Sequence, residues 1–328
     1  MQDNQPSSFF SSKPLKRIVV VIKIVFFALL CYYLFKTIQE KGQNIQDIYR
    51  LILSQFSAAN GLLLLLIFSL TFLNWACESK KWQTLARRVE VISFWQAFGG
   101  VFAGLALGFV MPNQVGDAAG RILSLKSRQR FNNIGAALLS NGLQFYVSLV
   151  FGTLGLGYFM VNQVSFQSWY YQILLVLLII TLIIGALVFG YRLSLTKYLE
   201  RFGLFRKVEP YLIVIDQYEF SEIKEAMFWA MLRYAVFSIQ FWLLFQLFNI
   251  KLGIIDSFAG IFLVFFSKTL IPAINFLGDL GIREASSLFV FGVYGIEPSL
   301  LIATTLSLWC VNIFIPTIVG IFWALKLR

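Results

Sequence analysis

The stretch PAINFLGDLGIRE, at residues 272–284, decides the fold, because it places helix breakers and charges between two long apolar runs. A second stretch, PNQVGDAAGR at residues 112–121, shares its main features. Each contains a proline, then a Gly-Asp pair, then an arginine four residues after the aspartate. Interrupted apolar segments at corresponding places in the two halves of a membrane chain point to a transporter's substrate site. We call the stretch at 112–121 the first motif and the stretch at 272–284 the second motif.

The composition is that of a membrane protein. Of the 328 residues, 59% are hydrophobic and only 13% are charged, whereas a soluble domain carries about 25% charged residues. The apolar runs are continuous and do not alternate, which predicts transmembrane helices and not a β-barrel. We therefore predict an all-α polytopic membrane protein.

The charge and the missing residue types exclude several classes of site. We attribute the net charge of +11 to cytoplasmic loops that follow the positive-inside rule, and not to nucleic-acid binding. The chain has no histidine, the commonest general base and metal ligand. Its three cysteines, Cys31, Cys77 and Cys310, lie in or beside apolar runs. The sequence therefore predicts no cofactor, no metal site and no disulfide framework.

Six apolar runs have the length of a membrane-crossing helix, which is about 20 residues. Residues 1–17 form a polar tail with lysine and arginine at its end, and we predict a single membrane domain over residues 18–328. No small-residue cleavage site follows the first run, so we interpret it as a span and not as a signal peptide. The polar stretch 78–90 is predicted to be a cytoplasmic loop. The predicted spans are residues 18–35, 56–77, 134–161, 171–191, 226–248 and 299–325.

The two motifs lie in further apolar segments, residues 94–130 and 258–295, which we predict to be re-entrant hairpins. If residues 94–111 crossed the membrane, the basic stretches at 121–130 and 192–207 would lie outside, against the Lys/Arg bias. A hairpin that returns keeps them inside and leaves the uncharged residues 162–168 outside. Residues 94–111 are long enough to span, so a full crossing stays open as the alternative. Their small residues Gly100, Gly104 and Gly108 predict close helix packing.

The hairpins give the chain two similar halves of opposite orientation. Residues 56–161 contain a span, a hairpin from the cytoplasmic side and a span. Residues 226–325 contain a span, a hairpin from the outside and a span. This pattern predicts an inverted repeat, with the two motif tips close together near the membrane midplane.

At its motifs the chain resembles the flippase-like transmembrane region of lysylphosphatidylglycerol synthases and its stand-alone relatives. The resemblance implies a domain of the bacterial inner (cytoplasmic) membrane that moves lipids, or lipid-linked molecules, between leaflets. The synthases add a soluble aminoacyl-transfer domain; this sequence ends three residues after its last predicted span, so we expect no such domain here. The residues that carry the resemblance are Pro112, Gly116, Asp117, Arg121, Pro272, Gly278, Gly281, Arg283 and Glu284.

The chemistry of the motifs suits an anionic head group. A helix that restarts after a break has a partial positive charge at its N-terminus, which favours phosphate. The Asp–Arg spacing allows an ion pair on one helical face, and arginine offers a planar fork to phosphate oxygens. The alternative is that each Asp–Arg pair only staples its hairpin. The predicted substrate-binding residues are Asp117, Arg121, Asp279, Arg283 and Glu284; the predicted helix-breaking residues are Pro112, Gly116, Pro272, Gly278 and Gly281.

Other polar residues within the predicted spans have simpler interpretations. Asn141, Gln144, Gln240 and Asn312 are expected to form hydrogen bonds between helices. Arg233 is expected to pair with an acidic residue or to extend toward the cytoplasmic surface.

The sequence as a whole predicts a lipid carrier that moves an anionic phospholipid or a lipid-linked glycan between leaflets. The first alternative is an intramembrane enzyme, or an accessory subunit of a lipid-modifying or glycosyl-transfer system, with Asp117, Asp279 or Glu284 as acid or base. The second alternative is a purely structural protein. Expected partners are membrane lipids, with a lipid-modifying enzyme or a second copy of the chain as further candidates, and no nucleic acid.

The predicted topology places both termini and residues 192–225 in the cytoplasm, and residues 162–168 outside. The substitutions Ser165→Cys and Ser194→Cys, each made alone in a chain without native cysteines, should therefore react with an impermeant thiol reagent from opposite sides of the membrane. Reaction of both from the same side would contradict the re-entrant hairpins.

Overall fold

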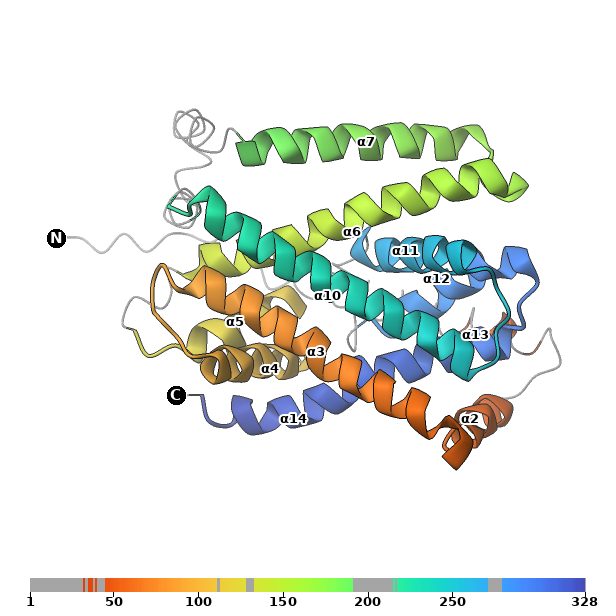
Figure 1. Ribbon diagram of the computed structural model, residues 1–328, viewed down its shortest axis with the longest axis horizontal. Helices are drawn as coiled ribbons and strands as arrows, with labels where there is room; N and C mark the ends of the chain where they lie inside the picture. The colour runs from red at the N-terminus through yellow and green to blue at the C-terminus, as the bar shows by residue number, and fades with distance from the viewer. Residues whose placement is uncertain are drawn as a thin grey trace, which may run out of the picture.

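The computed structural model describes residues 45–110, 113–127, 133–190, 217–270 and 279–327, together with residues 32, 35–37, 39 and 215. The elements formed by these residues are all helices (Figure 1), so the all-α class of a polytopic membrane protein is confirmed. The predicted first span lies outside the described residues except for residues 32 and 35.

The first half of the chain contains two long helices with a pair of shorter helices between them. The pair carries the first motif, and a further apolar helix, α7, packs against α6 at one edge of the bundle. The bounds are α2 (Ile45–Ser54), α3 (Gly61–Ala86), α4 (Phe94–Val110), α5 (Asn113–Leu123), α6 (Ile134–Asn162) and α7 (Trp169–Gly190).

The second half repeats this order: a long helix, a pair, and a long helix. The last long helix contains a π-helical segment, Cys310–Phe314, between α13 and α14. The bounds are α10 (Phe220–Leu247), α11 (Ile254–Leu270), α12 (Ile282–Phe291), α13 (Pro298–Trp309) and α14 (Ile315–Ala324).

Five helical segments within the described residues are long and apolar enough to cross a membrane. They correspond to five of the six predicted spans. Large apolar side chains such as Leu177 on α7 and Phe322 on α14 are more than half exposed, which suits a surface that contacts lipid. The segments are Ala58–Ala86, Ile134–Asn162, Trp169–Val188, Phe220–Leu247 and Pro298–Ala324.

The end of α3 corrects the end of the second predicted span. α3 continues to Ala86, beyond residue 77 where that span was predicted to end, and its Glu78 and Lys81 are only 2% and 1% exposed. The predicted end is wrong because it stops the span at its first charged residue. Glu78 and Lys81 neutralise each other at 2.8 Å, and further cations described below also contact Glu78, so the helix buries its charges.

Each helix pair returns to the end of the bundle from which it starts. Before α4, Glu90 accepts hydrogen bonds from the backbone N–H groups of Lys126 and Ser127, beyond α5, at 3.1 and 2.9 Å. In the first turn of α11, Asp256 accepts a hydrogen bond from the hydroxyl of Tyr294, beyond α12, at 2.8 Å. A carboxylate therefore closes the base of each pair. This is the chain path that hairpins require, and their re-entry into a membrane stays a prediction.

The helices α4 and α5 pack backbone against backbone. A Cβ atom at Gly120 would lie 2.2 Å from the nitrogen of Gly104, and a Cβ at Gly116 would lie 2.5 Å from the Cα of Gly108. A Cβ at Gly100 would lie 2.4 Å from the Oγ of Ser124, just beyond α5. The predicted close approach along the Gly100, Gly104 and Gly108 ladder is confirmed, and α5 is the helix that approaches.

The two hairpins lie toward opposite ends of the long helices (Figure 1). The helices α3 and α10 run antiparallel side by side; α4 packs against α14 of the second half, and α11 packs against α6 of the first half. Exchanging the halves maps these contacts onto one another, and α4 and α11 are both 17 residues long. The arrangement supports an inverted repeat. Superposition of residues 56–161 on 226–325 by a two-fold rotation stays a prediction.

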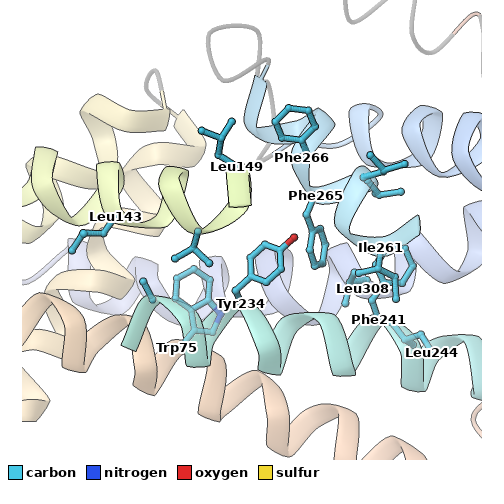
Figure 2. Close-up of a cluster of buried hydrophobic side chains, with 14 of the residues drawn as sticks. Trp75, Leu143, Leu149, Tyr234, Phe241, Leu244, Ile261, Phe265, Phe266 and Leu308 are labelled. Carbon is cyan, nitrogen blue, oxygen red and sulfur yellow. The ribbon is translucent and has the colours of Figure 1, made fainter. Parts of the chain in front are cut away.

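The core around α10 is rich in aromatic side chains (Figure 2). The ring of Tyr234 on α10 stacks on Phe151 of α6, with centroids 4.7 Å apart. The same ring lies edge-on to Phe265 of α11, with centroids 5.7 Å apart. The middle of α10 is thus held between a long helix of the first half and the hairpin of the second.

A polar cluster at the π-helical segment ties α3 and α10 to the last span. Pro316 has no N–H, so the carbonyl of Asn312 lacks its usual helical donor; the indole N–H of Trp75 donates to it at 3.1 Å. The side-chain amide of Asn312 donates to Gln240 at 2.7 Å and accepts from Asn74 at 3.1 Å. The predicted hydrogen bonds of Gln240 and Asn312 between helices are confirmed.

The glycine contact between α4 and α5 can be tested with one methyl group. Gly120→Ala should lower the stability of the folded protein in detergent by about 1–3 kcal/mol, the usual cost of overpacking. Gly142→Ala is the matched control, because a Cβ at that helical glycine meets nothing within 4 Å. The stability of both variants can be measured by denaturant unfolding. If Gly120→Ala were as stable as the control, the close contact between α4 and α5 would be contradicted.

Candidate functional site

Charged side chains gather in the middle of the bundle in two clusters. We call them the first cluster and the second cluster after the motif that each contains. Among the described residues, the first cluster consists of Glu78, Lys81, Asp117, Arg121 and Arg233, and the second of Lys268, Asp279, Arg283 and Glu284.

The first cluster is centred on Glu78 of α3. Its carboxylate lies 2.8 Å from the ammonium of Lys81, 2.9 Å from Arg121 of α5 and 3.1 Å from Arg233 of α10. Glu78 and Lys81 are fully buried, and Arg121 is 3% exposed. One carboxylate therefore connects α3 to α5, in the hairpin of the same half, and to α10, in the other half. The prediction that Arg233 pairs with an acidic residue is confirmed.

Every nitrogen of the Arg121 guanidinium has a partner within the protein. Its Nε and Nη2 donate to Asp117 at 3.0 and 2.8 Å, so the predicted pair along one helical face is present. Nη1 donates to Ser140 of α6 at 3.3 Å, and Nη2 also pairs with Glu78. The group lies 5.7 Å from the ring centroid of Trp82. Each of its three nitrogens thus has a protein partner.

The second cluster is centred on Asp279, immediately before α12. Nη2 of Arg283 donates to both carboxylate oxygens of Asp279 at 2.9 Å, and Lys268 of α11 pairs with the same carboxylate. Asp279 and Arg283 are each 1% exposed. The backbone of Asp279 has φ of 70°, a left-handed conformation that residues other than glycine adopt infrequently.

Arg283 differs from Arg121 in having unused donors. Its Nε and Nη1 are buried and have no hydrogen-bond partner among the described residues. These two nitrogens carry three N–H bonds, one on Nε and two on Nη1. Leaving a buried donor unsatisfied costs about 1–3 kcal/mol, and more when the group is charged. The arrangement favours an external acceptor at these donors.

Glu284 caps α12. Its Oε2 accepts the backbone N–H of Gly281 at 2.5 Å, in a capping box at the first turn. Gly281 has φ of 92°, which explains the need for glycine there. The sequence predicts that this helix N-terminus favours phosphate, but the structure places the protein's own carboxylate on it. The other oxygen of Glu284 is buried and has no hydrogen-bond partner among the described residues.

The two clusters meet along α10. The guanidinium of Arg283 lies 5.6 Å from the ring centroid of Phe237, and the ammonium of Lys268 lies 5.9 Å from it. Arg233, which belongs to the first cluster, precedes Phe237 by four residues, about 6 Å along a helix. Both residues are in the middle of the 28-residue α10. The structure thus brings the Asp–Arg pairs of the two motifs toward one place in the bundle.

The structure also shows which residues the sequence prediction missed. Glu78, Lys81 and Lys268 were not predicted as site residues, although each lies in or next to an apolar run, where an ionisable group indicates function. Gln144, which was predicted to bond between helices, accepts a hydrogen bond from Lys81 at 3.4 Å. Gly116 is buried against α4. The predicted helix breakers Pro112, Pro272 and Gly278 lie outside the described residues.

Comparison with known proteins gives one match. The family described as the lysylphosphatidylglycerol synthase TM region matches residues 20–320. No curated protein and no solved structure matches the chain. Within the part of the chain that the structure describes, no three histidine, cysteine, aspartate or glutamate side chains are grouped as metal ligands would be.

The central place of Glu78 can be tested by neutralising it. Glu78→Gln should destabilise the protein by about 3–5 kcal/mol, because it leaves buried cations without their counter-ion. Glu225→Gln is the control: it removes an ion pair with Arg87 in which both side chains are 44% exposed, and exposed pairs are worth less than about 1 kcal/mol.

A double-mutant cycle separates the pair from the rest of the cluster. Arg233→Gln combined with Glu78→Gln should cost less than the sum of the single changes, since the two groups lie 3.1 Å apart. The central place of Glu78 would be contradicted if the two single changes lowered the free energy of unfolding additively. It would also be contradicted if Glu78→Gln and Glu225→Gln had equal effects in denaturant unfolding.

Proposed function

This chain belongs to the lysylphosphatidylglycerol synthase TM region family, and on that premise we propose that it moves an anionic phospholipid or a lipid-linked glycan between the two leaflets of its membrane. Membership indicates a function related to membrane lipids. The helical fold, the lipid-exposed apolar surface and the charged middle of the bundle support the step from that general function to translocation.

The observation that carries the proposal is the set of unused donors on Arg283. Its Nε and Nη1 are buried and have no hydrogen-bond partner among the described residues, while Nη2 is fixed by Asp279. Asp279 therefore holds the guanidinium in one orientation and leaves the N–H bonds of Nε and Nη1 for another acceptor. Phosphate oxygens accept charge-assisted hydrogen bonds of this kind. In this proposal Arg283 binds the lipid phosphate and Asp279 positions it.

The charge of the two clusters also favours an anion. The described members of the clusters are five cations and four carboxylates. One positive charge is left over in a region that is largely shielded from solvent. A phosphate diester carries one negative charge, so its arrival would balance the clusters. A neutral or cationic head group would leave the excess charge in place.

The first cluster has a different part in this proposal. Because each nitrogen of Arg121 already has a protein partner, a phosphate could make a two-point contact with Arg121 only by displacing Asp117, Glu78 or Ser140. The pair formed by Glu78 and Arg233 bridges α3 and α10, one helix from each half. In transporters built from inverted repeats, one half rocks against the other around a central site. We assign to this pair the coupling of the halves during such a movement.

The orientation follows from the distribution of basic residues. α3 ends, α10 begins and α14 ends at the same end of the bundle (Figure 1). That end, which we call the basic end, carries Arg87, Arg88, Lys126, Lys224 and Lys326. By the positive-inside rule the basic end faces the cytoplasm. We extend this to the inner membrane of a bacterium, with both termini on the cytoplasmic side.

Replacing Arg283 tests the function directly. Arg283→Gln should slow the translocation of fluorescent phosphatidylglycerol in proteoliposomes by at least roughly tenfold, because a hydrogen bond to a charged group is worth about 1.5–3 kcal/mol. Arg283→Lys should be intermediate, since it keeps the charge but has one ammonium in place of the three nitrogens of the guanidinium.

The matched control is Arg88→Gln, which removes a surface cation that pairs with Glu222 at the basic end. It should insert, purify and translocate as the unmodified chain does. Normal translocation by Arg283→Gln protein that inserts and purifies normally would reduce the second motif to a structural role.

A further inference from the structure

A groove at the basic end lies outside both charge clusters. It is formed by α4, by the residues around the end of α5 and by the end of α14, and its volume is about 430 Å³. Ligand pockets in proteins commonly measure about 300–1,000 Å³. The groove is lined by apolar and small residues, including Gly99, Leu123 and Trp323, and by two cations, Lys126 and Lys326.

The two lysines are available to an external anion. Both are exposed, and among the residues that the structure describes no carboxylate lines the groove. The nearby Glu90 accepts hydrogen bonds from the backbone of Lys126 and Ser127. The ammonium of Lys326 lies 5.5 Å from the ring centroid of Trp323. The groove therefore combines two free positive charges with an aromatic and aliphatic wall.

Two tryptophans mark the level of the groove along the bundle. Trp323 lines it, and Trp95 at the start of α4 is 61% exposed nearby along the same helix as Gly99. Tryptophan is enriched where hydrocarbon meets water in membranes. From this level, exposed apolar side chains such as Phe322 and Ile318 continue along α14 toward the middle of the bundle. A phosphate between the lysines would leave its acyl chains against this apolar face.

The other half of the chain contains a groove that serves as an internal comparison. It lies between α6 and α11, measures about 340 Å³ and is lined by Leu154, Tyr158, Ile255, Phe258 and Phe262, among others. Exchanging the two halves exchanges the α4–α14 contact with the α6–α11 contact, so the grooves occupy equivalent places. Among the described residues, no charged side chain lines this second groove. The acid Asp256, next to Ile255, accepts a hydrogen bond from Tyr158 at 3.0 Å. Of the two equivalent positions, only the groove at the basic end is lined by cations.

From these observations we propose that the groove between α4, α5 and α14 is a binding site for an anionic phospholipid of the leaflet at the basic end. Lys126 and Lys326 bind the phosphate, Trp323 packs against the glycerol region, and the chains lie along α14. Ser124 lines the groove and donates a hydrogen bond to the backbone carbonyl of Arg121 at 2.6 Å, so the site adjoins the first cluster. The site stands whether or not the protein translocates lipid.

Native mass spectrometry of the purified full chain can test this with matched phosphatidylglycerol and phosphatidylcholine. A lysine near an anionic lipid contributes about 1 kcal/mol, roughly fivefold in affinity at low salt. Lys126→Gln combined with Lys326→Gln should therefore weaken phosphatidylglycerol binding by roughly 30-fold and leave phosphatidylcholine binding unchanged. The control, Lys224→Gln combined with Lys251→Gln, removes the same charge from positions that do not line the groove.

The position of the bound lipid can be located with the tryptophan in the groove. Brominated phosphatidylglycerol should quench tryptophan fluorescence more than brominated phosphatidylcholine does. Trp323→Phe, or Lys126→Gln combined with Lys326→Gln, should remove that difference. Equal losses of affinity in the groove variant and the control would show that net charge alone attracts the lipid, and would overturn the site. So would a groove variant that binds phosphatidylglycerol as the unmodified chain does. If the groove variant loses phosphatidylglycerol binding but translocates lipid normally, the binding site is independent of translocation. If it binds normally but no longer translocates, the lysines act in translocation and the groove is not the binding site.

Discussion

The structure depends on one buried carboxylate, that of Glu78. It accepts ion pairs from Lys81, Arg121 and Arg233, and so ties the first hairpin to the first long helix of each half. Each of these charges alone would cost about 2.5–3.5 kcal/mol at the centre of a membrane. Together they satisfy one another, and any movement that separates the halves must exchange these partners. This cluster ties α10 to α3, and the aromatic packing around Tyr234 holds α10 against α6 and α11.

Two motifs that look alike in sequence thus have different chemistry. In the first, the pair of Asp117 and Arg121 is absorbed into a network that leaves the guanidinium with a partner at each nitrogen. In the second, Asp279 fixes one nitrogen of Arg283 and leaves the other two unpartnered among the described residues. The interpretation that a motif only staples its hairpin describes the first well. For the second, the unused donors favour a ligand, and phosphate has the geometry and charge to fill them.

The sequence predicts the elements that have a local signal. The Asp–Arg spacing predicts both pairs, the Gly100, Gly104 and Gly108 ladder predicts close packing, and the basic stretches predict that the first helix pair returns. It does not predict that Glu78 is central, because the partners Arg121 and Arg233 lie far from it along the chain. The capping role of Glu284 has a local signal, a glutamate at the third position of a helix, which the prediction passed over in favour of substrate binding. The unused donors of Arg283 have no such signal, since they depend on which nitrogens find partners in the fold.

In the proposed function a lipid phosphate completes the hydrogen bonding of Arg283. A cryo-electron microscopy map of the full chain in nanodiscs that contain phosphatidylglycerol would test this directly. We expect phosphate density within hydrogen-bond distance of Nη1 or Nε of Arg283, with Asp279 still bound to Nη2. A map in which a carboxylate of the protein, such as that of Glu284, accepts from these nitrogens while lipid phosphates lie only at the bundle surface would contradict the proposal.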